Sequence, residues 1–93
     1  MDFEWDERKA LLNLERHGID FRRARKVFDG RDVVVRESPR QGEMRWIATA
    51  RLGEDLWSVV YTGRGGRIRI ISARRARNNE KERYYRSILG KGN

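Results

Sequence analysis

The sequence contains no cysteine and only one histidine among its 93 residues. Without cysteine, neither a disulfide framework nor a zinc–thiolate site can form. A lone histidine among scattered carboxylates also supplies no clustered ligands for a catalytic metal ion. We therefore expect no metal site and no cofactor. No stretch approaches the roughly 20 apolar residues of a membrane-spanning helix, so we expect no membrane partner.

The first ten residues, MDFEWDERKA, lack the basic-then-apolar order of a secretory signal, and we expect a cytoplasmic protein. The hydrophobic fraction of 38%, with three Trp, three Tyr and three Phe, is enough for one core. We expect a single domain over residues 1–93, with residues 90–93 forming a frayed tail.

Acidic residues are scarce in the last third of the chain. Residues 1–63 carry twelve basic and twelve acidic side chains, whereas residues 64–93 carry ten basic side chains against two glutamates. The last third therefore holds the whole net charge of +8. A one-sided positive field attracts polyanions, because each neutralised phosphate releases counterions. The alternative is a charged surface that only keeps the protein in solution.

Helical patterns occupy the first thirty residues. Asp6 can cap a helix over 7–17 that ends at Gly18 and presents Leu11 and Leu14 on one face. Asp20 can cap a second helical segment that stops at Gly30. A third helix is expected over residues 80–89, with Asn79 as its cap. Its apolar face consists of Tyr84, Tyr85, Ile88 and Leu89.

Between residues 32 and 73 the hydrophobic period is two, which indicates strands over 32–37, 44–52, 55–63 and 67–73. Residues 3–5 suit a short first strand. Short links favour antiparallel neighbours. The predicted fold class is α+β: N-terminal helices packed on a small, mostly antiparallel sheet, followed by a basic C-terminal helix.

Residues 67–77, RIRIISARRAR, crowd arginines on and just past the last strand. Alternation sends Ile68 and Ile70 to one face and Arg67 and Arg69 to the other. Guanidinium is planar, permanently charged and able to grip a phosphate through two parallel hydrogen bonds. We expect several of these groups to converge on one exposed patch, above all Arg69, Arg74 and Arg75. The RNA-binding candidates are Arg64, Arg67, Arg69 and Arg77.

Aromatic side chains lie on the same strands. Trp46 has the opposite parity to Arg45, and Trp57 shares its parity with Tyr61. Such rings either stack on unpaired bases or belong to the core, and burial statistics favour the core for tryptophan.

The segments FEWDERKALLNLERHGIDFRRARKVFDG, EMRWIATA and GRIRIISARRAR, with the following helix, closely resemble the BrnT family of bacterial toxins. The resemblance runs in order from Phe3 to about Tyr85. It implies a RelE-like fold, RNA cleavage and neutralisation by a BrnA-like ribbon-helix-helix antitoxin, with operator DNA contacted only through the antitoxin complex. Members commonly carry Lys-His-Gly where this chain has Arg16-His17-Gly18.

In RelE-like toxins an arginine beside the C-terminal helix stabilises the transition state, together with an inner-strand arginine and a helix tyrosine. By order along the chain, the resemblance maps these roles onto Arg74 or Arg75, onto Arg45, and onto Tyr84 or Tyr85. We expect one of the two tyrosines to be buried in the core, so that only the other reaches substrate.

His17 is the candidate general acid or base, because imidazole exchanges protons near neutrality. Its position before Gly18 is equally explained by the dipole of the preceding helix. A metal-free ribonuclease can use the neighbouring 2′-hydroxyl as the nucleophile, and the protein then has to stabilise the phosphorane.

Two functions are therefore predicted. The first is a metal-independent endoribonuclease toxin. The alternative is a non-catalytic nucleic-acid-binding module that acts in a DNA-bound regulatory complex, which would need no proton-transfer group.

Overall fold

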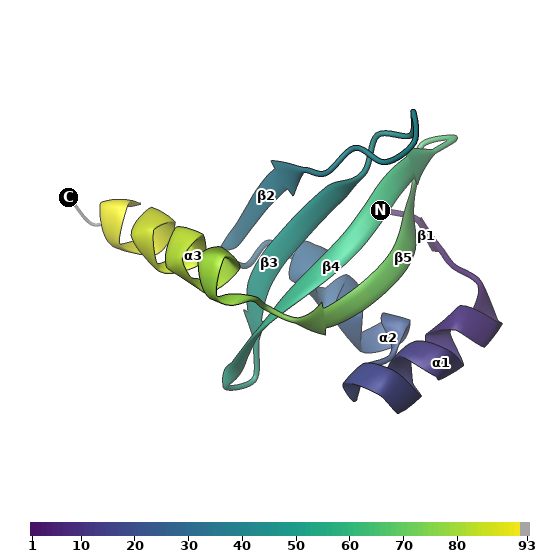
Figure 1. The fold of residues 1–93 in the computed structure, drawn as a ribbon, viewed down its shortest axis with the longest axis horizontal. Coiled ribbons are helices and arrows are strands. Elements are labelled where there is room, and N and C mark those ends of the chain that lie inside the picture. Colours follow the sequence, from purple (N-terminus) through teal and green to yellow (C-terminus); the bar gives the residue numbers. More distant parts are fainter. Residues whose placement is uncertain (92–93) are drawn as a thin grey trace.

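The structure is a computed structural model that describes residues 1–91, and Figure 1 shows how its elements are arranged. It consists of a twisted five-stranded sheet with helices on both faces. In chain order the elements are β1 (Phe3–Glu4), α1 (Glu7–His17), α2 (Phe21–Ala24), the 3₁₀ helix η1 (Arg25–Phe28), β2 (Val33–Glu37), β3 (Trp46–Leu52), β4 (Asp55–Arg64), β5 (Arg67–Arg75) and α3 (Asn78–Lys91).

The strand order is β1-β5-β4-β3-β2, so neighbours along the chain from β2 to β5 are neighbours in the sheet. These four strands pair antiparallel, and β1 pairs parallel with β5. The α+β class and the expected strands are confirmed. The expected small, mostly antiparallel sheet is confirmed, and the short first strand joins it in parallel, which makes it mixed.

The predicted helix signals at the N-terminus are confirmed. The Asp6 carboxylate accepts hydrogen bonds from the backbone N–H groups of Arg8 and Lys9, and Gly18 ends α1 with a φ of 74°. The Asp20 carboxylate caps α2 by accepting from the N–H of Arg23. After Ala24 the segment tightens into the 3₁₀ helix η1.

The expected apolar face of α1 is wrong. Leu11, Leu12 and Leu14 are 68%, 43% and 46% exposed, whereas Ala10 and Asn13 face the sheet. The Asn13 amide donates to the carbonyls of Ile19 and Ala73 and accepts from the Ala73 N–H. These bonds hold α1 close to β5, where small or polar side chains fit and leucines do not.

The main core lies between the sheet and the N-terminal helices. From the sheet it includes Ala48, Trp57, Val59 and Ile70, and the helical segment contributes mainly Ile19, Phe21, Ala24 and Val27. Ile68 packs against this core and Arg67 is exposed, so the predicted alternation at the start of β5 is confirmed. We call the side covered by α1 and α2 the core face of the sheet.

A register shift interrupts the pairing of β4 with β5. Tyr61 pairs with Ile70 but Val60 pairs with Ser72, so Ile71 is an extra residue in β5. Because of this bulge, Ile70 and Ala73 both face the core although they are three residues apart. Beyond the bulge the outward residues of β5 are therefore even-numbered, which places Arg74 on the opposite face.

Helix α3 lies on that opposite face, as Figure 1 shows. Tyr84 and Ala76 form a second, smaller core with Leu56, against which Val34 and Ile88 pack. The helix begins at Asn78, so the predicted cap at Asn79 is wrong; Arg77 precedes the helix and its carbonyl accepts from the Lys81 N–H. The predicted frayed tail overlaps the last two residues of α3, and its residues 92–93 lie outside the described residues.

Among residues 1–91, no helix is both long enough and apolar enough to cross a membrane.

Candidate nucleic-acid interface

A concave site lies on the α3 face of the sheet, and we call it the arginine hollow. Its volume is about 400 Å³. Five of the ten lining residues are arginines and none is acidic. The lining consists of Arg36, Ser38, Arg40, Arg45, Ile47, Val60, Ile71, Ser72, Arg74 and Arg77. These residues come from all four long strands, from the β2–β3 link and from the segment before α3.

The β2–β3 link presents two of the arginines. Gln41 and Gly42 both have positive φ, 46° and 80°, at the tip of a tight turn closed by paired backbone hydrogen bonds between Arg40 and Glu43. The Arg45 Nε donates to Glu43 Oε2 at 2.8 Å, which fixes the Arg45 side chain just before β3. This turn therefore places Arg40 and Arg45 on one wall of the hollow.

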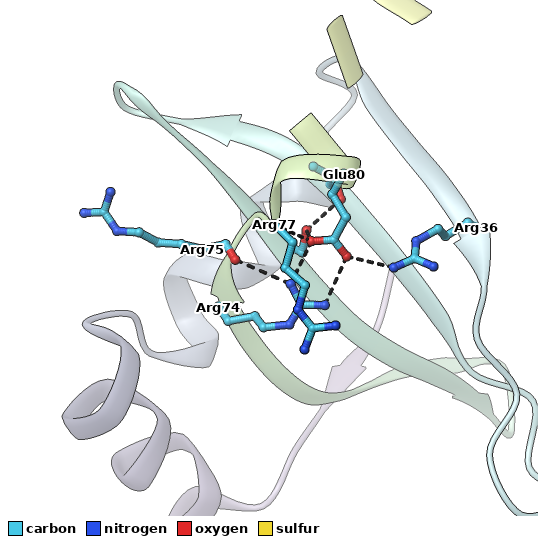
Figure 2. A network of polar contacts seen from close by, with 7 residues as sticks. Arg36, Arg74, Arg75, Arg77 and Glu80 are labelled. Atoms are coloured by element: carbon cyan, nitrogen blue, oxygen red, sulfur yellow. Dashed lines mark hydrogen bonds and ion pairs between the residues drawn. The ribbon is translucent and has the colours of Figure 1, made fainter. Parts of the chain in front are cut away.

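Behind the opposite wall lies Glu80 of α3, with a side chain that is only 1% exposed. Arg74 binds it through two hydrogen bonds, from Nη1 to Oε1 at 2.7 Å and from Nη2 to Oε2 at 3.0 Å. Arg36 Nη2 donates to Oε2 at 2.9 Å from the other side. Figure 2 shows the two guanidinium groups approaching Glu80 from different strands.

Glu80 also accepts from the Arg77 backbone N–H at 2.8 Å and from the Ser58 hydroxyl at 2.9 Å. Ser58 in turn shares a hydrogen bond of 2.7 Å with the Thr49 hydroxyl. Burial by itself would raise the pKa of the Glu80 carboxyl, but the hydrogen bonds from Arg74, the Arg77 backbone, Arg36 and Ser58 together hold the pKa well below its ordinary value. Glu80 is therefore an ionised, fully satisfied carboxylate.

The charges of the hollow do not cancel. Glu80 faces Arg36 and Arg74, and Glu43 faces Arg45. Within residues 1–91, the guanidinium groups of Arg40 and Arg77 have no carboxylate partner. Five cations against two anions leave a positive surplus, and this surplus lies on a concave surface that a phosphate group can enter.

A second, shallower hollow adjoins the first. It is lined by Lys9, Leu12, Asn13, Arg16, His17, Ile71 and Ser72, with a volume of about 300 Å³. Ile71 and Ser72 line both hollows, so the bulge in β5 forms the border between them. His17 is thus exposed at the end of α1 on the far side of that border.

The structure gathers Arg45, Arg74 and Arg77 of the predicted residues in the arginine hollow. The expected convergence of Arg69, Arg74 and Arg75 is not found. Arg69 forms an ion pair of 2.9 Å with Glu4 of β1. Arg75 lies opposite Trp57 on the core face, stacks over its ring at 5.2 Å and pairs with Asp55. Figure 2 shows Arg75 pointing away from Glu80.

The remaining predicted residues lie outside the hollow. Arg64 and Arg67 are exposed partners at the β4–β5 turn. Tyr84 is 7% exposed and belongs to the core under α3, whereas Tyr85 is 45% exposed. The prediction that one tyrosine is buried is confirmed. The Tyr85 hydroxyl accepts a hydrogen bond from Arg51 Nη2 at 3.1 Å, and neither tyrosine lines the hollow.

The aromatic residues of the strands pack with one another. Trp57 is 3% exposed, and Tyr61 packs against the main core. Trp46 is half-buried and stacks on Tyr61, with 5.9 Å between ring centroids. Burial also raises the pKa of the Tyr61 hydroxyl. Trp46, Trp57 and Tyr61 all lie on the core face, so the interpretation of these rings as core residues holds.

Three residues of the site were missed from the sequence: Arg36, Arg40 and Glu80. The alternation along β2 indicated the position of Arg36, because Val34 and Arg36 point to one face of the sheet and Val33 and Val35 point to the other. Glu80 is the third residue after Arg77, which is the spacing of a capping box, whereas the predicted cap was Asn79. Nothing in the sequence indicates that Arg40 lines the same hollow.

The fold and the hollow define a class: a small α+β protein with a concave, arginine-lined surface suited to phosphate groups. Residues 5–80 match the family model described as ribonuclease toxin, BrnT, of type II toxin-antitoxin system. The chain belongs to this family of ribonuclease toxins. Membership implies an RNA target and an antitoxin partner. No curated protein matches the chain.

Proposed function

We propose that the chain is an endoribonuclease whose substrate phosphodiester sits in the arginine hollow. The observation that carries this proposal is the gathering of five arginines, from two strands, the β2–β3 link and the segment before α3, around one cavity. Arginine forks hold a phosphate in a fixed orientation, which lysine does not. A surplus of positive charge also favours the phosphorane, which carries more negative charge than the starting diester.

In this reaction the 2′-hydroxyl next to the bound phosphate attacks the phosphorus atom and loses its proton. The bond from phosphorus to the 5′-oxygen breaks, and that oxygen takes up a proton. The products are a 2′,3′-cyclic phosphate and a free 5′-hydroxyl. Arg45, Arg74 and Arg77 stabilise the phosphorane. His17, which lines the adjoining hollow, exchanges one of the two protons, and solvent water exchanges the other.

The proposed reaction requires no metal ion. In the part of the chain that the structure describes, no three His, Cys, Asp or Glu side chains are grouped to hold one. The charge stabilisation that a metal would supply is available from the arginines instead.

Cleavage of purified cellular RNA in excess EDTA tests the proposal. We expect the wild-type chain to produce fragments with cyclic phosphate ends, and Arg74→Ala and Arg45→Ala to lower the rate at least about 100-fold. Arg64→Ala removes the same charge outside the hollow and should cleave like the wild type. Salt-dependent RNA binding without any cleavage would instead support the alternative, a non-catalytic nucleic-acid-binding module in a DNA-bound regulatory complex.

We also propose that a BrnA-like ribbon-helix-helix antitoxin inhibits the chain by covering the arginine hollow, and that operator DNA is contacted only through this complex. The apolar anchor that such a partner needs is present on α1, where Leu11, Leu12 and Leu14 are exposed. Leu12 lines the second hollow together with Lys9 and Arg16, which attract an acidic segment.

A further inference from the structure

The Glu80 carboxylate accepts the most hydrogen bonds of the polar groups described at the site, but it does not contact the cavity. The two oxygens of Glu80 accept five hydrogen bonds, three on Oε1 and two on Oε2. The side chain is 1% exposed, so substrate cannot touch it. Two of its donors, Arg36 and Arg74, do line the hollow. Glu80 therefore acts on substrate only through other residues.

An acidic side chain is unexpected directly behind a site that would bind phosphate, because phosphate is also negatively charged. Its charge lies directly against two of the five cations and offsets part of their attraction for a polyanion. Arg36 and Arg74 lie on β2 and β5, which are not neighbours in the sheet, and their like charges repel each other. A carboxylate that accepts from both is the group that allows the two cations to stay close together.

Glu80 also fixes geometry. The two parallel hydrogen bonds from Arg74 hold its guanidinium plane in one orientation. The Arg77 backbone N–H donates to Glu80 Oε1. This hydrogen bond fixes the start of α3 and the point on the backbone from which the Arg77 side chain extends. One carboxylate thus determines the positions of three hollow arginines.

We propose that Glu80 is a positioning residue that lowers the affinity of the hollow for RNA while it raises the rate of cleavage. This rests on the proposed ribonuclease function. Attraction to a phosphodiester depends on net charge, which Glu80 reduces. Stabilisation of the phosphorane depends on the orientation of the donors, which Glu80 sets. A residue that only stabilises the fold would not separate binding from rate in this way.

The variant Glu80→Gln keeps the size of the side chain and a carbonyl oxygen but removes the charge. We expect RNA to bind at least about threefold more tightly, because a buried negative charge is removed from the site. We expect the single-turnover cleavage rate to fall roughly 10- to 100-fold, because the arginine planes lose their alignment. Glu82→Gln is the matched control, since Glu82 is exposed on the same helix and the charge change is identical.

Three measurements decide the proposal: RNA affinity from fluorescence anisotropy in EDTA, the single-turnover rate on the same RNA, and the circular dichroism of each variant. Weaker or unchanged RNA binding by Glu80→Gln overturns the proposal, and so does an unchanged cleavage rate in a wild type that cleaves. A wild type that does not cleave contradicts the ribonuclease function itself, and the affinity of Glu80→Gln then still tests the positioning role.

If Glu80→Gln does not fold, Ser58→Ala replaces it. This variant removes one neutral donor from Glu80 and leaves the ion pairs with Arg36 and Arg74 in place. We expect the cleavage rate to fall about two- to fivefold with no loss of RNA affinity, since only the alignment of the carboxylate is loosened. Cleavage at the wild-type rate by Ser58→Ala would then refute the positioning role.

Discussion

At the residue scale, the site depends on the planar shape of the guanidinium group as much as on its charge. Arg74 uses two parallel N–H donors to grip Glu80 and still contributes to the lining of the hollow. An ammonium group cannot do both, because it is a point charge without a fork. The arginine content of β5 therefore has a structural reason that net charge alone does not supply.

Arg74→Lys tests this reasoning. The charge is kept, but the two-point contact with Glu80 is lost and the cation is free to move. We expect RNA binding to change less than threefold and the cleavage rate to fall at least about tenfold. Arg64→Lys, a change outside the hollow, is the control for both measurements. A lysine variant that cleaves at the wild-type rate would show that charge alone is sufficient.

Glu80 should also make stability depend on pH. Its pKa is lowered in the folded chain, so its contribution is complete above the ordinary value of 4.5 and is lost as the pH falls below it, where the unfolded chain takes up a proton that the folded chain does not. At neutral pH we expect Glu80→Gln to lower the free energy of unfolding by about 1.5–3 kcal/mol.

Urea unfolding of wild type and Glu80→Gln at pH 7 and at pH 3 measures this linkage. The difference between the two proteins should be largest at pH 7 and smaller at pH 3. A difference that is the same at both pH values would mean that the charge of Glu80 does not stabilise the fold. Glu82→Gln should match the wild type throughout.

At the scale of elements, α1 is attached to the sheet by a polar residue. Asn13 is 7% exposed and satisfies backbone groups of Ala73 in β5 and Ile19 in the link to α2. This contact holds α1 beside β5, so that His17 at its end lines the second hollow. The position of the candidate proton carrier thus depends on one amide.

Asn13→Ala should destabilise the protein by at least about 2 kcal/mol, because the buried N–H and C=O groups of Ala73 lose their partner. Thermal and urea unfolding measure the loss. Glu15→Ala on the exposed side of the same helix is the control, with an expected change within about 0.5 kcal/mol. Equal effects in the two variants would contradict the attachment of α1 through Asn13.

Substitution of the exposed leucines of α1 should affect antitoxin binding and not the stability of the fold. Leu11→Gln with Leu14→Gln should leave the free energy of unfolding within about 0.5 kcal/mol of the wild type, since neither side chain is buried. The double variant should still cleave RNA. Its affinity for the proposed BrnA-like antitoxin should fall at least about tenfold, as measured by calorimetry. Unchanged antitoxin affinity would place the partner elsewhere, and Leu89→Gln on α3 is the control.

Local signals in the sequence predicted the elements well because their causes are local. The caps at Asp6 and Asp20, the stop at Gly18 and the period of two along the strands depend on near neighbours only. The bulge at Ile71 depends on pairing between strands, and it is what turns Arg74 to the α3 face while Arg75 turns to the core face. Alternation counted along β5 from Ile68 and Ile70, without the bulge, would place Arg74 on the core face and Arg75 on the α3 face, which is the reverse of what the structure shows.

The candidate site was predicted in part for the same reason. The excess of arginine in the last third indicated phosphate binding, and Arg45, Arg74 and Arg77 do meet in one hollow. Arg36 and Arg40 come from the charge-balanced part of the chain and reach the hollow only through strand order. The burial of Glu80 behind them is a tertiary contact that no local pattern specifies.

At the scale of the whole molecule, the two faces of the sheet have different tasks. The core face is covered by α1, α2 and η1 and buries most of the apolar side chains. The other face carries α3 with its small core and, beside it, the arginine hollow. Net charge of +8 on a chain of 93 residues adds a field that attracts RNA from a distance.

Because the hollow has five arginines opposed by Glu43 and Glu80, we expect it to displace about two to three counterions from a single strand. A plot of the logarithm of the binding constant against the logarithm of salt concentration should then have a slope of about −1.5 to −2. Arg77→Ala, which removes a cation without a carboxylate partner, should make the slope shallower by about 0.7.

Arg64→Ala should leave the slope of binding to a short oligonucleotide unchanged, since Arg64 lies outside the hollow. Fluorescence anisotropy with an RNA of about six nucleotides over a range of KCl concentrations measures all three slopes. If Arg64→Ala reduces the slope as much as Arg77→Ala does, RNA is held by the diffuse field of the whole molecule. A change confined to Arg77→Ala locates binding in the hollow, where arginine orientation can act on a single phosphate.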